Sequence, residues 1–178
     1  MKITIFETGK PQTLEAILAN KDRRATLQNQ LLKQFPSKTL LTIKLNTPGT
    51  IKNNEKIKHI FTTGIIQLRH YFPVVENEWS FDQLVTGPEV FWIINLSAIE
   101  SKQRSVAFEE NFQLGRLFDV DVLSKGKIIS RNDLNLPSRK CLICSDYAKS
   151  CARSQRHSIL QLQFKISKMY QNYYKHEN

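Results

Sequence analysis

The sequence predicts an α+β fold, in which helices flank a largely antiparallel sheet within a single domain at residues 1–178. Apolar residues recur at helical spacing in three long segments. Between these segments lie short runs of β-branched and aromatic residues, separated by turn residues. A length of 178 residues and a hydrophobic content of 40% suit one domain with a buried core. A small Cys/His-rich segment at residues 139–157 and a C-terminal helix complete the expected architecture.

Helices are predicted where apolar residues recur every three or four positions. Thr13 is a suitable N-cap for the first helix, and Pro36 and Pro73 end the first and the second. The charged run at residues 21–24 interrupts the first apolar stripe, which indicates a solvated face or a break between two helices, with a phosphate contact as the other interpretation. Residues 97–104 fit a short helix or a loop. The predicted long helices cover residues 13–35, 53–72 and 154–174.

Strands are predicted where β-forming residues alternate or run continuously between turns. The run at residues 90–94 is wholly apolar, so we expect a central, buried strand there. Residues 106–109 are interpreted as the start of a strand that leads into residues 114–122. A tight turn at residues 125–127 then connects to a returning strand. The predicted strands lie at residues 39–45, 79–86, 90–96, 117–122 and 128–130.

Asp119 and Asp121 stand two residues apart within an apolar strand pattern. Side chains two apart in a strand project from the same face, so we expect the two carboxylates side by side, roughly 6–7 Å apart at the backbone. Two like charges so placed repel unless a cation or a proton lies between them. Mg²⁺ with open positions for phosphate oxygens suits this place, and Gly115 and Arg116 suit a nearby phosphate. The alternative is a half-buried strand with two solvated aspartates.

A turn around Pro48 and Gly49 precedes the second predicted helix. The free N–H groups at a helix N-terminus can bind an anion, and Lys52 would add a positive charge there. An ordinary β-turn is the alternative interpretation.

The chain carries a formal net charge of +10, and its distribution is uneven. Residues 125–178 hold eleven Lys or Arg against three acidic residues, which gives this third of the chain a charge of +8. This charge favours a polyanionic partner, such as a phosphorylated ligand, an acidic protein or nucleic acid. A solvated basic face without a partner is the alternative.

No run of about 18 apolar residues occurs, so neither a membrane span nor a membrane partner is expected.

Three cysteines and a histidine fall close together in the basic third. Cys141, Cys144, Cys151 and His157 can together supply the soft and borderline donors of a tetrahedral Zn²⁺ site. Because four protein ligands leave no open position, such a site would be structural. Three reduced cysteines beside a surface histidine are the alternative.

An odd number of cysteines so closely spaced argues against a secreted disulfide framework, and no secretory signal is recognised. We therefore expect a cytoplasmic protein.

Several motifs taken together resemble those of a known enzyme family. The sequence is similar to the apo-citrate lyase phosphoribosyl-dephospho-CoA transferases, also called holo-citrate lyase synthases, which attach the prosthetic group to the acyl carrier protein of citrate lyase. The resemblance extends over most of the chain and is tightest from residue 114 to 157. The motifs that carry it are residues 48–52, 86–89, 114–122, 129–137, 139–144 and 151–157.

The resemblance implies a nucleotidyltransferase-type reaction. A phosphoribosyl-dephospho-CoA unit would pass from triphosphoribosyl-dephospho-CoA to a serine of the acyl carrier protein, the gamma subunit of citrate lyase, with release of pyrophosphate. Mg²⁺ held by the two aspartates would assist the displacement, and a carboxylate would accept or orient the serine proton. The basic third of the chain would bind the acidic carrier protein. The catalytic candidates are Asp119, Asp121, Arg116 and Glu109, and the substrate-binding candidates are Gly115, Lys52, Gly49, Arg131 and Arg153.

The sequence departs in one respect from a related motif, and two other functions are possible interpretations. Nucleotidyltransferases of the polymerase-β kind place a Gly-Ser pair well before their Asp-x-Asp motif. Here Gly115 precedes Asp119 by only four residues, and Arg116 stands where the serine would be, so membership of that fold is undecided. A zinc-stapled, basic nucleic-acid-binding module would leave the aspartate strand unexplained, and it lacks a recognisable reading helix. A carrier-protein-binding chaperone without activity is the other alternative.

Overall fold

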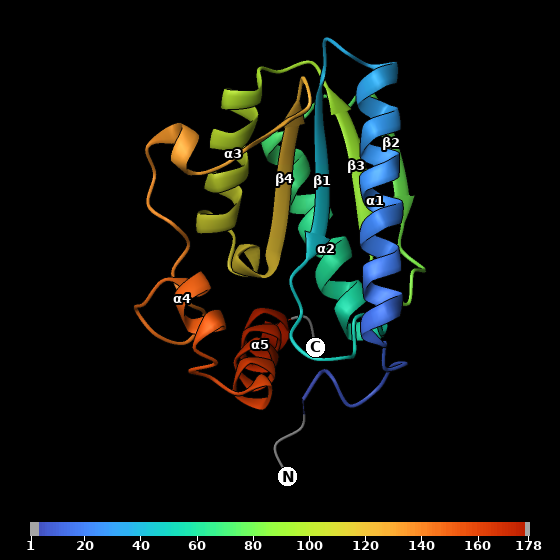
Figure 1. The fold of residues 1–178 in the computed structure, drawn as a ribbon. Helices are drawn as coiled ribbons and strands as arrows, with labels where there is room; N and C mark the ends of the chain where they lie inside the picture. Colours follow the sequence, from blue (N-terminus) through green and yellow to red (C-terminus); the bar gives the residue numbers. More distant parts are fainter. Residues whose placement is uncertain (1–3, 177–178) are drawn as a thin grey trace.

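The sheet consists of five antiparallel strands in the order β2-β3-β1-β4-β5, as the computed structural model shows for residues 4–176 (Figure 1). The predicted α+β class with an antiparallel sheet is confirmed. The strands are β1 (Thr39–Leu45), β2 (Asn77–Phe81), β3 (Glu89–Ile94), β4 (Phe118–Ser124) and β5 (Lys127–Ile129). The helices are α1 (Leu14–Gln34), α2 (Glu55–Tyr71), α3 (Ala98–Asn111), α4 (Ala148–Arg153) and α5 (Ile159–Tyr173).

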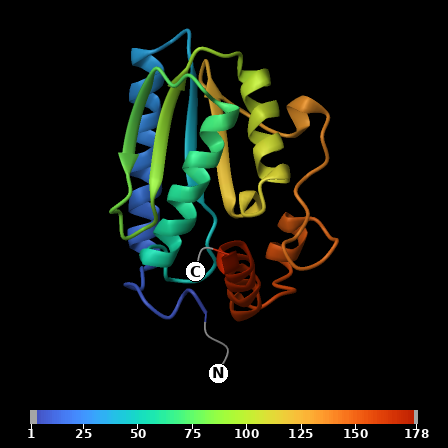
Figure 2. The same ribbon diagram turned by 180° about the vertical axis from the view of Figure 1, so that it is seen from behind.

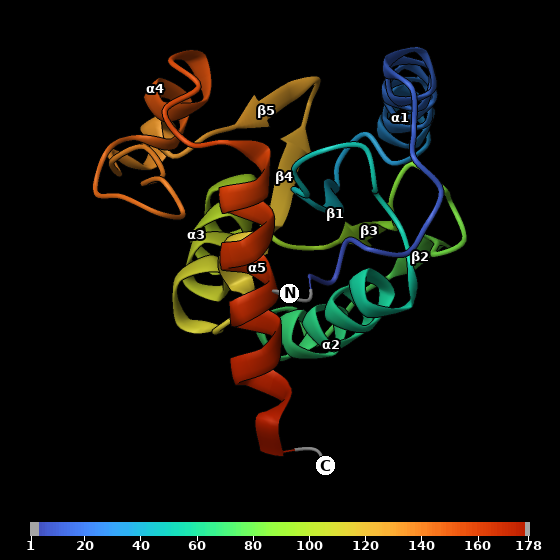
Figure 3. The same cartoon turned by 90° about the horizontal axis from the view of Figure 1, so that it is seen from below.

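Helices cover the two faces of the sheet unequally. Helices α2 and α3 pack on one face, where they enclose the main apolar core around Trp92 and Phe118 (Figure 2). On the other face α1 covers mainly β1 and β3, through a smaller core that includes Leu31 and Phe91 (Figure 3). Leu123, near the end of β4, belongs to this smaller core, whereas Asp119 and Asp121 of the same strand remain partly exposed. No helix within residues 4–176 combines the length and the apolar character needed to cross a membrane.

Helix α1 runs without a break through the charged residues 21–24. Arg23 and Arg24 turn toward the sheet, where each lies 2.5 Å from a carboxylate oxygen of Glu89 on β3. Asn20 donates a further hydrogen bond of 2.7 Å to the same carboxylate. The buried charge of Glu89 is thus paired with side chains of α1. Among the interpretations of this run, the helix break is wrong, and Arg23 and Arg24 anchor the helix to the sheet.

Residues 106–109 form the last turns of α3, so the predicted strand at these residues is wrong. The buried positions of α3 follow a helical period, because they fall in pairs at residues 101–102, 105–106 and 108–109. Two of these positions are occupied by Ser101 and Ser105. Their hydroxyl groups donate to the backbone carbonyls of Ser97 and Ser101, at 2.7 and 2.8 Å. A search for apolar periodicity misses this face, because its small polar residues are satisfied by the helix itself.

Two other boundaries differ from the prediction. Strand β2 ends at Phe81, because the following residues form a turn in which Gly87, at φ +115°, donates its N–H to Leu84 O. Helix α5 begins only at Ile159, because Ser158 and Gln161 form a capping box there. The helix lies across the end of the sheet, where Gln163 donates to Pro48 O at 3.1 Å (Figure 1).

Candidate functional site

Asp119 and Asp121 project from the same face of β4, as the strand spacing predicts. The Nζ atom of Lys44, on β1, lies between them, 2.6 Å from Asp119 Oδ2 and 2.8 Å from Asp121 Oδ2. The pairing of β1 with β4 sets this contact, because it places Lys44 directly opposite Asp119. The cation that two adjacent carboxylates require is thus supplied by another strand of the same sheet.

Lys44 and Asp119 hold each other in the charged state. Burial by itself would lower the pKa of Lys44, but Asp121 and Asp119 outweigh burial and raise it. Burial would likewise raise the pKa of Asp119, and the opposing attraction of Lys44 lowers it below its usual value. The side chains of Asp119 and Asp121 remain 38% and 32% exposed, so a ligand in solution can reach their oxygens.

The outer edge of β4 carries cations instead of a full strand partner. Strand β5 pairs only with residues 122–124, which leaves residues 118–121 without a strand partner on that side. Lys102 donates to Val120 O at 3.1 Å, and Arg139 donates to Phe118 O at 2.8 Å. Burial lowers the pKa of Lys102. These long side chains protect the strand edge and bring positive charge close to the aspartates.

Glu109 lies on α3, and its side chain is 2% exposed. Its carboxylate oxygens lie 2.5 Å from Arg139 and 3.0 Å from Arg131. Arg131 also contacts Glu110, at 2.9 Å. Glu109 therefore stands at the centre of a guanidinium cluster. The geometry suits a carboxylate that positions arginines.

Each predicted substrate-binding glycine has a structural reason, which is packing at Gly115 and a left-handed backbone conformation at Gly49. A Cβ atom on Gly115 would lie 2.5 Å from the backbone oxygen of Phe108, at the end of α3. Gly49 has φ +84°, and a Cβ there would lie 2.7 Å from the side chain of Gln163. Both glycines thus permit close approach between chain segments, whether or not a ligand binds.

The predicted cationic contacts are separated by the fold. Lys52 donates to Thr47 O at 2.6 Å, and burial lowers its pKa. Arg131 is held by its two glutamates. Arg153 is exposed at the end of α4 and does not line the cavity described below. Arg116 is the one member of the predicted set that does.

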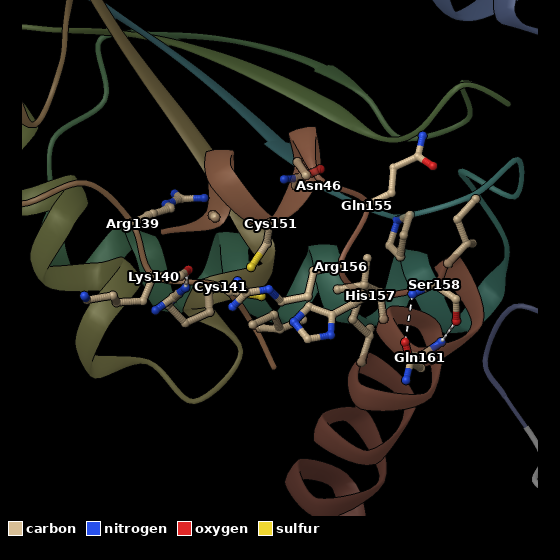
Figure 4. A pocket seen from close by; sticks show the side chains of 18 of the residues that line it. Asn46, Arg139, Lys140, Cys141, Cys151, Gln155, Arg156, His157, Ser158 and Gln161 are labelled. Carbon is tan, nitrogen blue, oxygen red and sulfur yellow. Dashed lines mark hydrogen bonds between the residues drawn. The ribbon is translucent and has the colours of Figure 1, made fainter. Parts of the chain in front are cut away.

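A cavity of about 860 Å³ lies between α4, α5 and the end of β1 (Figure 4). Its basic lining side chains are Arg116, Arg139, Lys140 and Arg156, and its larger apolar ones include Leu117, Leu142, Leu162 and Ile166. None of the described residues that line it is acidic. Asn46, which also lines it, comes two residues after Lys44, so the cavity begins next to the aspartate pair. Sequence reasoning missed three of the four basic residues as cavity residues. Arg139, Lys140 and Arg156 lie close in sequence to the candidate metal ligands Cys141 and His157, and this proximity could have indicated that they share a site.

The four predicted metal ligands converge on one point. The Sγ atom of Cys144 lies 3.4 Å from Cys151 Sγ and 3.3 Å from His157 Nε2. All four ligand atoms, including Cys141 Sγ, lie within 4.8 Å of one another. Ligand atoms around a tetrahedral metal ion with bonds of 2.0–2.3 Å are about 3.3–3.8 Å apart. The cluster can therefore hold a metal ion.

Comparison with known proteins gives a consistent result over almost the whole chain. A family model described as apo-citrate lyase phosphoribosyl-dephospho-CoA transferase matches residues 12–173. A probable apo-citrate lyase phosphoribosyl-dephospho-CoA transferase of Streptococcus pyogenes serotype M18 is 34% identical over 182 residues, which cover 99% of this chain and 94% of that protein. The apo-citrate lyase phosphoribosyl-dephospho-CoA transferase of Escherichia coli O7:K1 is 33% identical over 156 residues, or 84% of each chain.

This chain also matches part of a longer relative. Protein CitXG of Leuconostoc mesenteroides subsp. cremoris is 36% identical over 174 residues, which are 96% of this chain but 37% of that protein. This chain thus spans little more than a third of the length of that relative.

Proposed function

Since the chain belongs to the apo-citrate lyase phosphoribosyl-dephospho-CoA transferase family, we propose that it transfers the phosphoribosyl-dephospho-CoA group to citrate lyase. The donor is triphosphoribosyl-dephospho-CoA, the acceptor is a serine of the acyl carrier protein, the gamma subunit, and pyrophosphate leaves. The observation that carries the proposal is the family match over residues 12–173, which includes both the aspartate pair and the basic cavity. Neither a nucleic-acid-binding module nor an inactive chaperone accounts for that match.

The direct test is the mass of the carrier protein. Purified carrier protein incubated with this protein, Mg²⁺ and the triphosphate donor should gain the mass of one phosphoribosyl-dephospho-CoA group. Mutation of the acceptor serine to alanine should prevent the gain. An unchanged carrier mass in the complete reaction would contradict the proposed function.

In the proposed mechanism, Asp119 and Asp121 hold Mg²⁺. The residues fit this role, because their Oδ2 atoms already converge within 2.8 Å of one positive centre, the Nζ atom of Lys44. Mg²⁺ held there would supply a positive charge that offsets the negative charge on the leaving pyrophosphate. Lys44, which contacts both carboxylates, would keep a positive charge beside the phosphates. Asp119 or Asp121 accepts or orients the proton of the acceptor serine.

The remaining predicted residues act around this pair. Arg116 contacts the phosphate chain from the cavity. Glu109 is a positioning residue in this proposal, because it fixes the guanidinium groups of Arg131 and Arg139. The basic third of the chain attracts the acidic carrier protein, so complex formation should weaken as the salt concentration rises.

The Cys3His cluster, formed by Cys141, Cys144, Cys151 and His157, is proposed to hold a structural Zn²⁺. Three sulfur atoms and one imidazole nitrogen are a common donor set for Zn²⁺ and fill all four positions. The thiols must be reduced to bind it, which is the state expected in a cytoplasm.

Zinc analysis of the purified protein tests this assignment. Freshly purified wild-type protein should contain close to one Zn²⁺ per chain by mass spectrometry. His157→Ala should lose most of the metal and unfold at a lower temperature, because it removes one ligand. His70→Ala is the matched control, since His70 is exposed on α2, far in sequence from the cluster. Wild-type protein without near-stoichiometric zinc would rule the assignment out.

A further inference from the structure

The cavity between α4, α5 and the end of β1 carries positive charge that the chain does not fully compensate. Arg139 and Arg156 are paired, at 2.5 Å, with Glu109 and Asp146. Within residues 4–176, Lys140 and Arg116 have no carboxylate within 4.0 Å. Lys140 instead lies over the ring of Tyr147, 4.4 Å from its centroid. Because none of the lining residues within residues 4–176 is acidic, an anion entering the cavity would be attracted by its basic wall.

Arg116 gives a second, independent indication of an anion-binding site. Its Nε atom is buried and has no hydrogen-bond partner in the described part of the chain, while its Nη2 donates to the backbone oxygen of Lys140. A buried guanidinium N–H without an acceptor is costly. Burial, together with repulsion from Arg139 and Arg131, lowers the pKa of Arg116. An oxyanion in the cavity would supply the absent acceptor and relieve the repulsion.

The first turn of α5 contributes polar groups to the same wall. Ser158 and Gln161 line the cavity (Figure 4). Ile159, between them in the sequence, lines it as well. The capping box uses the backbone N–H groups of Ser158 and Gln161, and leaves those of Ile159 and Leu160 to other acceptors. The N-terminus of a helix carries a partial positive charge, which favours phosphate oxygens.

The cavity also has an apolar part. Pro48, Leu162 and Ile166 lie among its lining residues. A volume of about 860 Å³ is in the range of sites that bind ligands of several hundred daltons. The ligand class that fits both parts is amphiphilic, with a multiply charged phosphate group at one end and a less polar body.

The metal cluster and the basic wall are built from the same short segments. Lys140 directly precedes Cys141, and Arg156 directly precedes His157. Between residues 130 and 158, Cys151 is the only buried residue, so this segment has almost no apolar core of its own. A metal ion at the cluster would hold the segment in one conformation, and with it the two cations.

We propose that this cavity binds the polyphosphate group of an amphiphilic ligand, and that a metal ion at the Cys3His cluster holds its basic wall in place. In naming the triphosphate donor as that ligand, the proposal rests on the proposed function. The binding of a small polyphosphate does not depend on it, so pyrophosphate is the probe for the test.

Calorimetric titration of the full chain with pyrophosphate tests the anion site. Arg156→Gln should bind pyrophosphate at least about tenfold more weakly than wild type, because it removes a charged hydrogen-bond donor from the wall. The matched control is Lys149→Gln, which removes one positive charge from α4 at a residue that does not line the cavity. Its affinity should stay within about threefold of wild type. Wild-type affinity in Arg156→Gln, with zinc content unchanged, would overturn the anion site.

Cys144→Ser tests the role of the metal ion. Cys144 is a cluster ligand that does not line the cavity, so the substitution leaves the cavity surface as it is. The variant should lose its metal and bind pyrophosphate at least about tenfold more weakly, while its circular dichroism keeps the signature of the sheet and the long helices. A metal-free variant with wild-type affinity would overturn the link between metal and anion.

The two proposals fail in different ways. If pyrophosphate binds as expected but the carrier protein gains no mass, the anion site stands and the proposed function fails. If transfer proceeds normally in Arg156→Gln and its pyrophosphate affinity is also unchanged, the function stands and the polyphosphate binds elsewhere.

Discussion

Asp119→Asn is expected to reduce the rate of prosthetic-group transfer by about a hundred- to a thousandfold. The amide keeps the size of the carboxylate but removes the charge that opposes Lys44 and that would bind Mg²⁺. Because Asp119 acts on the phosphate chain, binding of the carrier protein should be unchanged. The carrier-modification assay followed over time measures the first quantity, and calorimetry with the carrier protein measures the second.

Asp22→Asn is the matched control, since Asp22 is exposed on α1. It should transfer at the wild-type rate. Electron paramagnetic resonance with Mn²⁺ measures metal binding separately from transfer. Asp119→Asn should weaken Mn²⁺ binding, because it removes a carboxylate ligand. Transfer at the wild-type rate by Asp119→Asn would show that the aspartate pair is a structural ion pair with Lys44.

Gly64→Ala is expected to lower the free energy of unfolding by about 3 kcal/mol, although alanine favours helices. A Cβ atom on Gly64 would lie 1.9 Å from Cζ of Phe118. Phe118 is fully buried and its ring packs against Phe61 and Phe108, with centroids 6.1 and 5.3 Å away. The ring therefore has no room to move, and α2 must shift away from the sheet. For a chain of this size the melting temperature should fall by roughly 6–12 °C.

Urea unfolding followed by circular dichroism measures the change. Thr62→Ala, at an exposed position of the same helix, is the control and should stay within about 0.5 kcal/mol of wild type. Adding Phe118→Leu to Gly64→Ala should recover part of the loss, because the smaller side chain makes room for the new methyl group. Equal midpoints for Gly64→Ala and wild type would contradict this account of the packing between α2 and β4.

The sequence predicts those parts of this fold that depend on local spacing. Strand β1 has the predicted bounds, and α1 begins after the predicted N-cap Thr13, because apolar periodicity and a capping side chain act within a few residues. Local spacing failed for α3, where two buried positions are serines that bond to their own helix. The family resemblance extended the prediction to an activity class, which the match over residues 12–173 supports.

By itself the sequence determined that Asp119 and Asp121 share a face, and it suggested that Cys141, Cys144, Cys151 and His157 act together, because each set lies within one short segment. Only the tertiary structure decided that Lys44, 75 residues from Asp119, stands between the two carboxylates. It alone also brought Asn46, Arg116 and the first turn of α5 around one cavity. Pairing of distant strands and packing of α5 across the sheet end set these contacts, and neither leaves a periodic signal in the residues that make them.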